Sequence, residues 1–217
     1  MKKAVILLSG GLDSATVLFY AKRKGFKPFA LIFDYGQRHK KEIRQAVKIA
    51  RHASCPYHLV KIALPWKGSS LLNKKMSLPR HKTIDPKKIP STYVPARNII
   101  FLSFAVSFAE AIGAGTVFIG ANALDYSGYP DCRPRFFNAY RRAVSEGMKS
   151  GIEGKRIRIE APLIRKTKAQ IVKMGSGLGV PFPLTWSCYK GGARPCGVCD
   201  SCRLRQKGFN LAGIKEK

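Results

Sequence analysis

Acidic residues are scarce in this sequence, and their scarcity leaves a strongly basic chain. Asp and Glu number 12 against 40 Lys and Arg, which gives a formal net charge of +28 over 217 residues. The basic residues are scattered from end to end, without a long Lys/Arg block. A field of this sign attracts polyanions, so nucleic acid is one candidate partner. A solvated basic surface explains the same composition, and the charge alone leaves both interpretations open.

Two kinds of hydrophobic segment are also absent: a signal peptide and a membrane-length apolar run. The first apolar run, residues 4–8, is too short for a secretory leader and ends at a Ser-Gly-Gly turn. Residues 99–121 carry Glu110 as their single charge, but the glycines at 113 and 115 divide them into a helix-length piece and a short strand-like piece. We therefore expect a core helix followed by a buried strand, no contact with a membrane, and a cytoplasmic protein.

Cysteine is concentrated near the C-terminus rather than spread along the chain. Cys188 is followed at +8, +11 and +14 by Cys196, Cys199 and Cys202, with Gly and Pro between them to turn the chain. Without a signal peptide, such clustering indicates a metal site in a reducing compartment rather than disulfides. Four thiolates suit tetrahedral Zn²⁺. The C-x2-C-x2-C portion is also compatible with an iron–sulfur cluster, although the fourth cysteine precedes it; we predict one structural zinc.

Apolar runs alternate with amphipathic stretches through most of the chain. The expected strands lie at residues 3–8, 28–36, 57–64, 116–120 and 156–163, and the expected helices at residues 13–24, 38–53, 96–112, 134–149 and 167–175. Thr167 and Gln170 fit a capping box at the start of the last of these helices. The series predicts an α/β fold with a doubly wound, mainly parallel sheet. Ligands of such sheets bind at the carboxyl ends of the strands.

The turn Ser9-Gly10-Gly11-Leu12-Asp13-Ser14 follows the first expected strand and opens the first expected helix. Glycines let the backbone approach a ligand closely, and the unpaired N–H groups at a helix start favour an anion. An acid such as Asp13 repels phosphate unless a cation lies between them, and Mg²⁺ is the simplest such cation. The turn matches neither the Walker loop nor G-x-G-x-x-G. It resembles the S-G-G-x-D-S pyrophosphate loop of the N-type ATP pyrophosphatases, which implies that it binds ATP.

Two further polar segments are candidates for the same nucleotide. Asp34, Tyr35 and Arg38 follow the second expected strand, whose carboxyl end neighbours the first turn in a doubly wound sheet. Lys168 stands at the start of a helix, where the helix dipole does not favour a cation. A phosphate contact explains this lysine, and so does simple solvation.

Six motifs together resemble the 7-cyano-7-deazaguanine synthase family, from Ser9 to about Phe209: "SGGLDS", "DYGQRH", "YVPARN", "SGYPDCRPRF", "TWSCY" and "CGVCDSCRLR". Ala96 departs from the V-P-G-R-N usual in the family, and Gln170 stands where Glu is common. The resemblance implies an adenine nucleotide alpha hydrolase-like fold and a homodimer. It implies that ATP and ammonia convert 7-carboxy-7-deazaguanine to the nitrile, 7-cyano-7-deazaguanine (preQ0), a precursor of queuosine and archaeosine.

The resemblance also implies roles for individual residues. The expected ATP and Mg²⁺ site comprises Leu8, Ser9, Gly10, Gly11, Leu12, Asp13, Ser14, Ala15, Thr16, Val17, Leu18, Asp34, Tyr35 and Arg38. Asp13, Ser14 and Lys168 are the expected catalytic residues. The expected substrate site comprises Arg97, Asn98, Asp125, Tyr129, Asp131, Arg133, Phe136 and Trp186.

Within the substrate site, a carboxylate can accept hydrogen bonds from the N1–H and N2 amine of a guanine-like ring. Asp131 is the first candidate for this contact and Asp125 the second. Arg133 suits the substrate carboxylate, and Tyr129, Phe136 or Trp186 can stack on the base. Each of these residues also suits ordinary loop structure.

The last forty residues are rich in Gly, Cys and Arg and read as a separate small module. We expect an ATP-binding α/β domain over residues 1–180, with a zinc-binding module over residues 181–217 packed on it. Residues 65–92 are Pro-, Lys- and Ser-rich and read as a long functional loop.

Two other functions compete with the synthase. A tRNA-modifying enzyme with the same loop, such as a thiolase or a lysidine-type ligase, is supported by the net charge and the cysteines. A zinc-ribbon nucleic-acid binder without catalysis leaves the "SGGLDS" turn unexplained.

Overall fold

The computed structural model describes residues 1–66, 68–79, 88–124 and 128–216. Asp125, one of the expected substrate residues, lies outside the described residues. The strands, in chain order, are β1 (Lys2–Leu7), β2 (Phe26–Asp34), β3 (Tyr57–Lys61), β4 (Thr116–Phe118) and β5 (Arg158–Glu160). They form one parallel sheet in the order β3-β2-β1-β4-β5. β1 lies at its centre, with Val5 paired to Phe29 of β2 on one side and to Val117 of β4 on the other.

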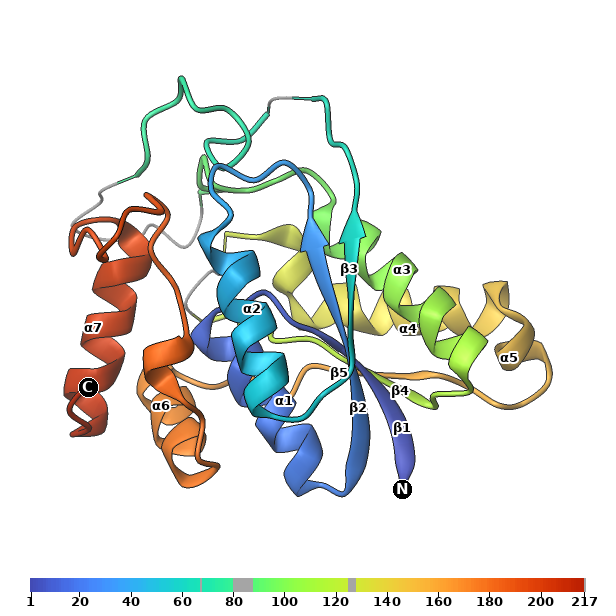
Figure 1. Cartoon of the computed structure of the whole chain (residues 1–217). Helices are drawn as coiled ribbons and strands as arrows, with labels where there is room; N and C mark the ends of the chain where they lie inside the picture. The colour runs from blue at the N-terminus through green and yellow to red at the C-terminus, as the bar shows by residue number, and fades with distance from the viewer. Residues whose placement is uncertain (67, 80–87, 125–127, 217) are drawn as a thin grey trace.

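The helices cover both faces of this sheet (Figure 1). They are α1 (Leu12–Arg23), α2 (Lys41–His52), α3 (Arg97–Ile112), α4 (Pro134–Gly147), α5 (Lys149–Ile152), α6 (Lys168–Gly177) and α7 (Asp200–Ala212), with short 3-10 turns at Pro130–Cys132 and Phe182–Leu184. The expected doubly wound α/β fold is therefore confirmed. Among the described residues, no helix is long and apolar enough to cross a membrane.

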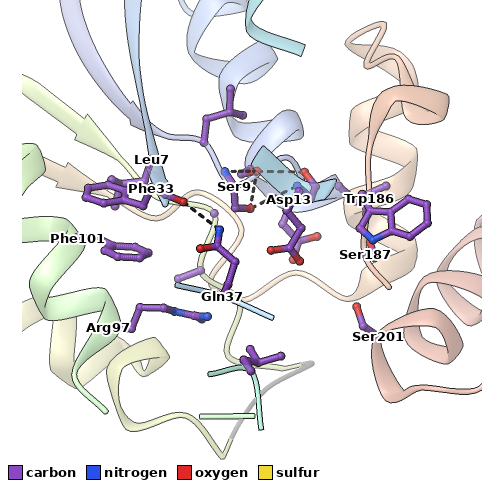
Figure 2. A pocket seen from close by; sticks show the side chains of 18 of the residues that line it. Leu7, Ser9, Asp13, Phe33, Gln37, Arg97, Phe101, Trp186, Ser187 and Ser201 are labelled. Atoms are coloured by element: carbon purple, nitrogen blue, oxygen red, sulfur yellow. Dashed lines mark hydrogen bonds between the residues drawn. The ribbon is translucent and has the colours of Figure 1, made fainter. Parts of the chain in front are cut away.

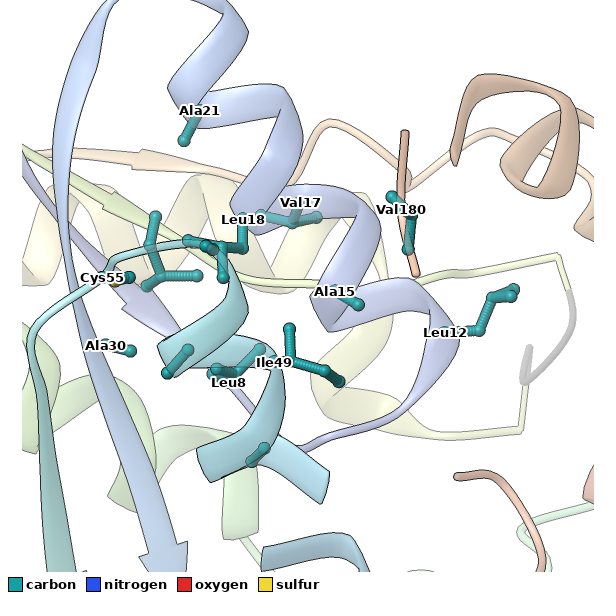
Figure 3. Packing of buried hydrophobic residues seen from close by; sticks show 14 of the residues in the cluster. Leu8, Leu12, Ala15, Val17, Leu18, Ala21, Ala30, Ile49, Cys55 and Val180 are labelled. Carbon is teal, nitrogen blue, oxygen red and sulfur yellow. The ribbon is translucent and has the colours of Figure 1, made fainter. Parts of the chain in front are cut away.

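Alternation of side chains along β1 divides the interior into two cores. Ala4 and Ile6 point to the face that α1, α2, α6 and α7 cover, where Leu18 and Ile49 pack (Figure 3). The intervening residues of β1 point to the other face, toward α3 and α4. Because both faces are covered, β1 is apolar at every buried position, as a central parallel strand requires.

Most elements begin or end a few residues from the expected positions, and two of these differences have a clear structural reason. The strand expected at 156–163 is paired over Arg158–Glu160, because its neighbour β4 spans only Thr116–Phe118 and the ladder ends where the partner ends. The helix expected at 134–149 stops at Gly147, since Met148 has an extended backbone (φ −123°, ψ 147°). The capping box is confirmed: the Thr167 side chain accepts from the Gln170 N–H, and Gln170 accepts from the Thr167 N–H.

The C-terminal segment returns to the rest of the fold. Phe209 of α7 is 1% exposed, and its ring meets that of Phe182 edge-on at 5.1 Å between centroids, within the core of α1 and α2. Trp186, Cys188 and Tyr189 form a smaller cluster with the other cysteines. The division at residue 180 stays a prediction, since the C-terminal segment has a cluster of its own and also completes the main core.

Candidate active site and cysteine cluster

A cavity of about 270 Å³ opens at the carboxyl ends of β1, β2 and β4. β2 lies on one side of β1 and β4 on the other, so the chain order reverses at this point, where doubly wound sheets bind their ligands. The loop after β1 and the first turn of α2, which packs on it, line one side, and the first turn of α3 lines another. Figure 2 shows Ser9 and Asp13 of the loop and Arg97 of α3. The C-terminal segment closes a third side through Trp186, Ser187 and Ser201.

The loop between β1 and α1 is held by its own serines and by close backbone packing. The Ser14 hydroxyl accepts from the Ser9 N–H at 3.2 Å and donates to the Gly11 carbonyl at 3.1 Å. Gly10 has φ +83°, and a Cβ there would lie 2.2 Å from the Glu42 carbonyl oxygen of α2. A Cβ on Gly120, after β4, would lie 2.9 Å from the Ser14 nitrogen. The loop is therefore clamped between α2 and the end of β4.

Asp13 and Lys168, both expected to be catalytic, meet at the cavity. The Lys168 ammonium donates to both carboxylate oxygens of Asp13 at 2.8 Å, joining α1 to α6. Gly208 of α7 packs on the stem of this lysine, where a Cβ would lie 2.3 Å from Lys168 Cγ. The structure thus brings the two residues together, while their contacts with Mg²⁺ and phosphate stay predictions.

Trp186 ties the C-terminal segment to the loop. Its backbone N–H donates to the Gly10 carbonyl at 2.8 Å, and its indole N–H donates to the Cys188 carbonyl at 2.8 Å. The Lys41 ammonium lies 4.1 Å from the ring centroid and donates to the carbonyls of Gly192 and Ala193. Trp186 lines the cavity, as a stacking residue must.

Several expected substrate residues line the side of the cavity opposite the C-terminal segment. Arg97, Asn98 and Tyr129 are among them, together with Tyr35. The Tyr35 hydroxyl accepts from Arg97 Nη1 at 3.3 Å, and burial raises the pKa of Tyr35. The Tyr129 hydroxyl is bonded to Thr92 Oγ1 at 2.6 Å. These contacts fix polar groups at the cavity wall, and their contact with substrate stays a prediction.

The residues of the "PDCRPRF" segment lie mostly behind the cavity wall. Asp131 is 5% exposed, and its carboxylate accepts from the Asn98 backbone N–H at 3.1 Å, at the start of α3. Arg133 is exposed and precedes α4, and Phe136 packs against neighbouring rings of α4. None of these three lines the cavity among the described residues. In this arrangement Asp131 accepts at the start of α3, and a hydrogen bond that it accepts from a base stays a prediction.

Some of the expected ATP residues have other contacts. Asp34 pairs with Lys40 and lines a separate cavity. Arg38 lines the main cavity, but its guanidinium donates to three backbone carbonyls of the 70–76 segment. The last four residues of the expected loop segment do not line the cavity. They are buried within the fold on α1, each 0% exposed: Ala15, Thr16, Val17 and Leu18. Thr16 bonds the Leu12 carbonyl at 2.9 Å.

Other wall residues were absent from the expected set. Phe33 and Phe101 stack with ring centroids 4.0 Å apart on one side of the cavity (Figure 2). The Gln37 amide accepts from the Tyr35 N–H and donates to the Phe33 carbonyl. Glu42 lines the wall from the first turn of α2. Gln37 stands in the quoted "DYGQRH" motif, whereas nothing local in the sequence marks Phe101 or Glu42.

The four clustered cysteines converge as their spacing predicts. All four Sγ atoms lie within 4.8 Å of one another, and three of the four residues are buried. The Cys196 N–H donates to Cys188 Sγ at 3.3 Å. A hydrogen bond from the Cys202 thiol lowers the pKa of Cys199, while the same contact raises the pKa of Cys202. A set of four converging sulfur donors fits a thiophilic metal ion.

A Ser-Gly-Gly-x-Asp-Ser loop, placed where the strand order of a parallel α/β sheet reverses, is the pyrophosphate loop (PP-loop) of a class of ATP-binding proteins. The fold is similar to that of NMN synthetase from Francisella tularensis, with a TM-score of 0.51 and 16% identity over 99% of this chain and 78% of that one. At that identity the similarity concerns the fold alone. The chain belongs to the family described as "Queuosine biosynthesis protein QueC", whose model matches residues 3–213.

Named relatives match over nearly the whole chain. The 7-cyano-7-deazaguanine synthase of Thermoplasma volcanium is 54% identical over 99% of this chain and 89% of its own length. The protein of that name from Trichormus variabilis is 52% identical over 99% of this chain and 96% of its own length.

Proposed function

We propose that this protein is a 7-cyano-7-deazaguanine synthase, which uses ATP and ammonia to convert 7-carboxy-7-deazaguanine to the nitrile. The observation that carries the proposal is the 54% identity, over almost the full chain, with a relative of that name. The loop at the switch point and the Asp13–Lys168 pair beside it support ATP as the second substrate. The family does not favour the tRNA-modifying alternative.

The chemistry explains why a nucleotide loop borders a substrate cavity. A carboxylate is a poor electrophile, because its oxygen is a poor leaving group. Transfer of AMP to that oxygen gives an acyl adenylate, which ammonia converts to the amide. Transfer of a second AMP to the amide oxygen, followed by its elimination, leaves the nitrile. The protein contributes chiefly by positioning the reacting oxygens and stabilising the charge that develops on them.

Named residues suit each of these tasks. The backbone N–H groups of the loop and the hydroxyls of Ser9 and Ser14 suit the pyrophosphate oxygens. Asp13 would hold Mg²⁺, which supplies charge neutralisation at the phosphates when bound. Lys168 is then released from Asp13 and contacts phosphate. Arg97 and Trp186 are the wall residues that suit the substrate carboxylate and ring.

The cysteine cluster is proposed to hold one structural Zn²⁺ through Cys188, Cys196, Cys199 and Cys202. The four donors leave no position for a reacting ligand, which is typical of a structural site. Four free thiols so close together also imply a reducing cytoplasm. Cys199→Ser is expected to lower metal content and thermal stability together. Metal analysis of the purified protein distinguishes zinc from iron with sulfide, and a variant that keeps one equivalent of metal contradicts this ligand set.

A homodimer is proposed through the outer face of α3. No charged residue occurs between Asn98 and Ala109, yet Ile99 is 41% and Phe104 42% exposed. In a chain of net charge +28, an uncharged apolar face is where two copies approach with least repulsion.

The test of the function is one incubation of the purified protein with 7-carboxy-7-deazaguanine, ATP, Mg²⁺ and ammonium. Mass spectrometry is expected to detect the nitrile, and nucleotide analysis AMP and pyrophosphate. AMP release that requires tRNA in place of the deazaguanine contradicts the proposal and favours a tRNA-modifying enzyme, whose substrate would then account for the basic surface.

A further inference from the structure

Basic side chains outnumber acidic ones on the cavity wall, and one of the acidic side chains accepts no hydrogen bond from a described residue. Its described wall carries the basic groups Arg38, Arg97, Lys168 and Arg205. The acids on that wall are Asp13 and Glu42. Both oxygens of Asp13 accept from Lys168, so its charge is compensated. No described residue donates a hydrogen bond to the Glu42 carboxylate, which is the acid available to a ligand.

The packing of α2 against the loop after β1 also fixes the position of Glu42. This residue stands in the first turn of α2, where its carbonyl approaches Gly10 so closely that only glycine fits. Its carboxylate interacts electrostatically with Arg97 and Tyr35 across the cavity. The group therefore lies between the loop that holds the nucleotide and the wall assigned to the substrate.

Burial suits this acid to proton transfer. Desolvation raises the pKa of Glu42 from 4.5 to about 7, against the opposing effect of the Arg97 charge. A group with a pKa near the working pH both accepts and releases protons readily. The other charged or titratable residues of the wall are Asp13, Tyr35, Arg38, His39, Arg97, Tyr129, Cys132, Lys168, Tyr189 and Arg205.

The reaction of the proposed function creates a need for such a group. Nitrogen enters as ammonium at neutral pH and leaves as a nitrile that bears no hydrogen. Ammonium loses one proton to become the nucleophile, and the adduct loses a second as the C–N bond forms and AMP departs. The amide loses its remaining two as the C≡N bond forms and the second AMP carries away the oxygen. A cationic cavity also repels ammonium unless a carboxylate attracts it.

Other titratable wall groups are poorly suited to this role. The thiol of Cys132 has a pKa raised to about 12 by burial. Burial, together with the charges of Arg38 and Lys41, lowers the pKa of His39, whose ring also bonds the Cys188 backbone. Burial raises the pKa of the Tyr35 phenol, which accepts from Arg97. Guanidinium groups do not release protons.

We propose that Glu42 is a catalytic residue that binds ammonium in the cavity and accepts its protons as the amide and then the nitrile form. This assignment rests on the proposed function and goes beyond it by identifying the site of the nitrogen substrate. Each proton passes from nitrogen to the Glu42 carboxylate and from there to solvent before the next transfer.

The test separates activation of the carboxylate from attack by nitrogen. Isotope exchange between pyrophosphate and ATP, with 7-carboxy-7-deazaguanine and without ammonia, reports the first adenylation. In Glu42→Gln this exchange is expected to stay within about twofold of wild type, while kcat/KM for ammonium falls about 100-fold or more. The rise of kcat/KM for ammonium through pH 7 is expected to disappear in the variant.

Hydroxylamine provides the decisive comparison, because it is uncharged at neutral pH and attacks acyl adenylates without first losing a proton. Glu42→Gln is expected to form the hydroxamate within about threefold of the wild-type rate. Glu146→Gln, an exposed acid of α4, is the matched control and is expected to behave as wild type in all assays.

Each other outcome has one meaning. Loss of pyrophosphate exchange in Glu42→Gln, or failure of hydroxylamine to restore product, overturns the assignment and makes Glu42 a structural or nucleotide-binding residue. Unchanged kcat/KM for ammonium in that variant also overturns it. Absence of exchange in the wild-type protein contradicts the proposed function itself.

Discussion

Gly10 is the residue at which backbone conformation and helix packing together exclude a side chain. Its φ is +83°, and a Cβ would lie 2.2 Å from the Glu42 carbonyl oxygen and 2.8 Å from the Ala46 nitrogen. Backbone atoms cannot rotate away as a flexible side chain can. The approach of α2 to the nucleotide loop therefore depends on this glycine.

Gly10→Ala is expected to destabilise the protein by about 3 kcal/mol or more, since left-handed strain and a backbone clash add. Gly36→Ala is the matched control: its φ is +79°, but nothing lies within 4 Å of the added carbon. Strain alone is expected to cost the control about 1–2 kcal/mol. Urea denaturation of both variants measures the difference, and equal losses would mean that the contact with α2 is unimportant.

Glu42 is expected to lower stability at alkaline pH. Its folded-state pKa of about 7 exceeds its ordinary value of 4.5, so the folded protein binds the proton more tightly than the unfolded chain. Stability is therefore lost as pH rises from 4.5 to 7, by up to about 3 kcal/mol. Glu42→Gln is expected to gain stability relative to wild type at pH 8 and not at pH 4, as measured by urea denaturation at both. A gain independent of pH would contradict the raised pKa.

The contact between α6 and α7 holds Lys168 beside Asp13. A Cβ on Gly208 would lie 2.3 Å from Lys168 Cγ and 3.0 Å from its Cβ. Gly208→Ala is therefore expected to displace this lysine from Asp13 and lower pyrophosphate exchange about tenfold, with stability little changed because alanine favours the helix. Gly177→Ala, at the end of α6 with open space around it, is the control. If pyrophosphate exchange is the same in Gly208→Ala as in wild type, Lys168 adjusts to the added carbon without losing its contact with Asp13.

Elements were more predictable from the sequence than the site that they build. The apolar runs and the "SGGLDS" turn locate β1 and α1, because a buried parallel strand and a glycine turn have local signatures. The pattern at residues 156–163 also locates β5, but the length of the paired strand depends on β4 and has no local signature. The burial of Asp131 depends on the Asn98 N–H, 33 positions away. The raised pKa of Glu42 depends on burial in the assembled cavity, and no local pattern reports it.

The whole molecule combines a strong positive charge with one uncharged helix face. If α3 is the dimer interface, Phe104→Lys places two added charges across it and is expected to raise the dimer dissociation constant at least about tenfold. Leu211→Lys, on α7 and 65% exposed, is the control. Sedimentation equilibrium measures both, with thermal melting to check folding. A monomeric wild-type protein at micromolar concentration would contradict the proposed dimer.

The hydrogen bond from Trp186 to the Gly10 carbonyl joins two parts of the chain that are synthesised at different times. Trp186 follows Gly10 by 176 positions, so the loop leaves the ribosome well before the wall that Trp186 supplies. At about 5–20 residues per second, the loop exists for roughly 10–35 seconds before that wall is synthesised. A nascent chain thus carries an exposed, anion-attracting turn without the enclosure needed for chemistry. The cavity beside the loop is therefore closed on this side only after Trp186 has been synthesised.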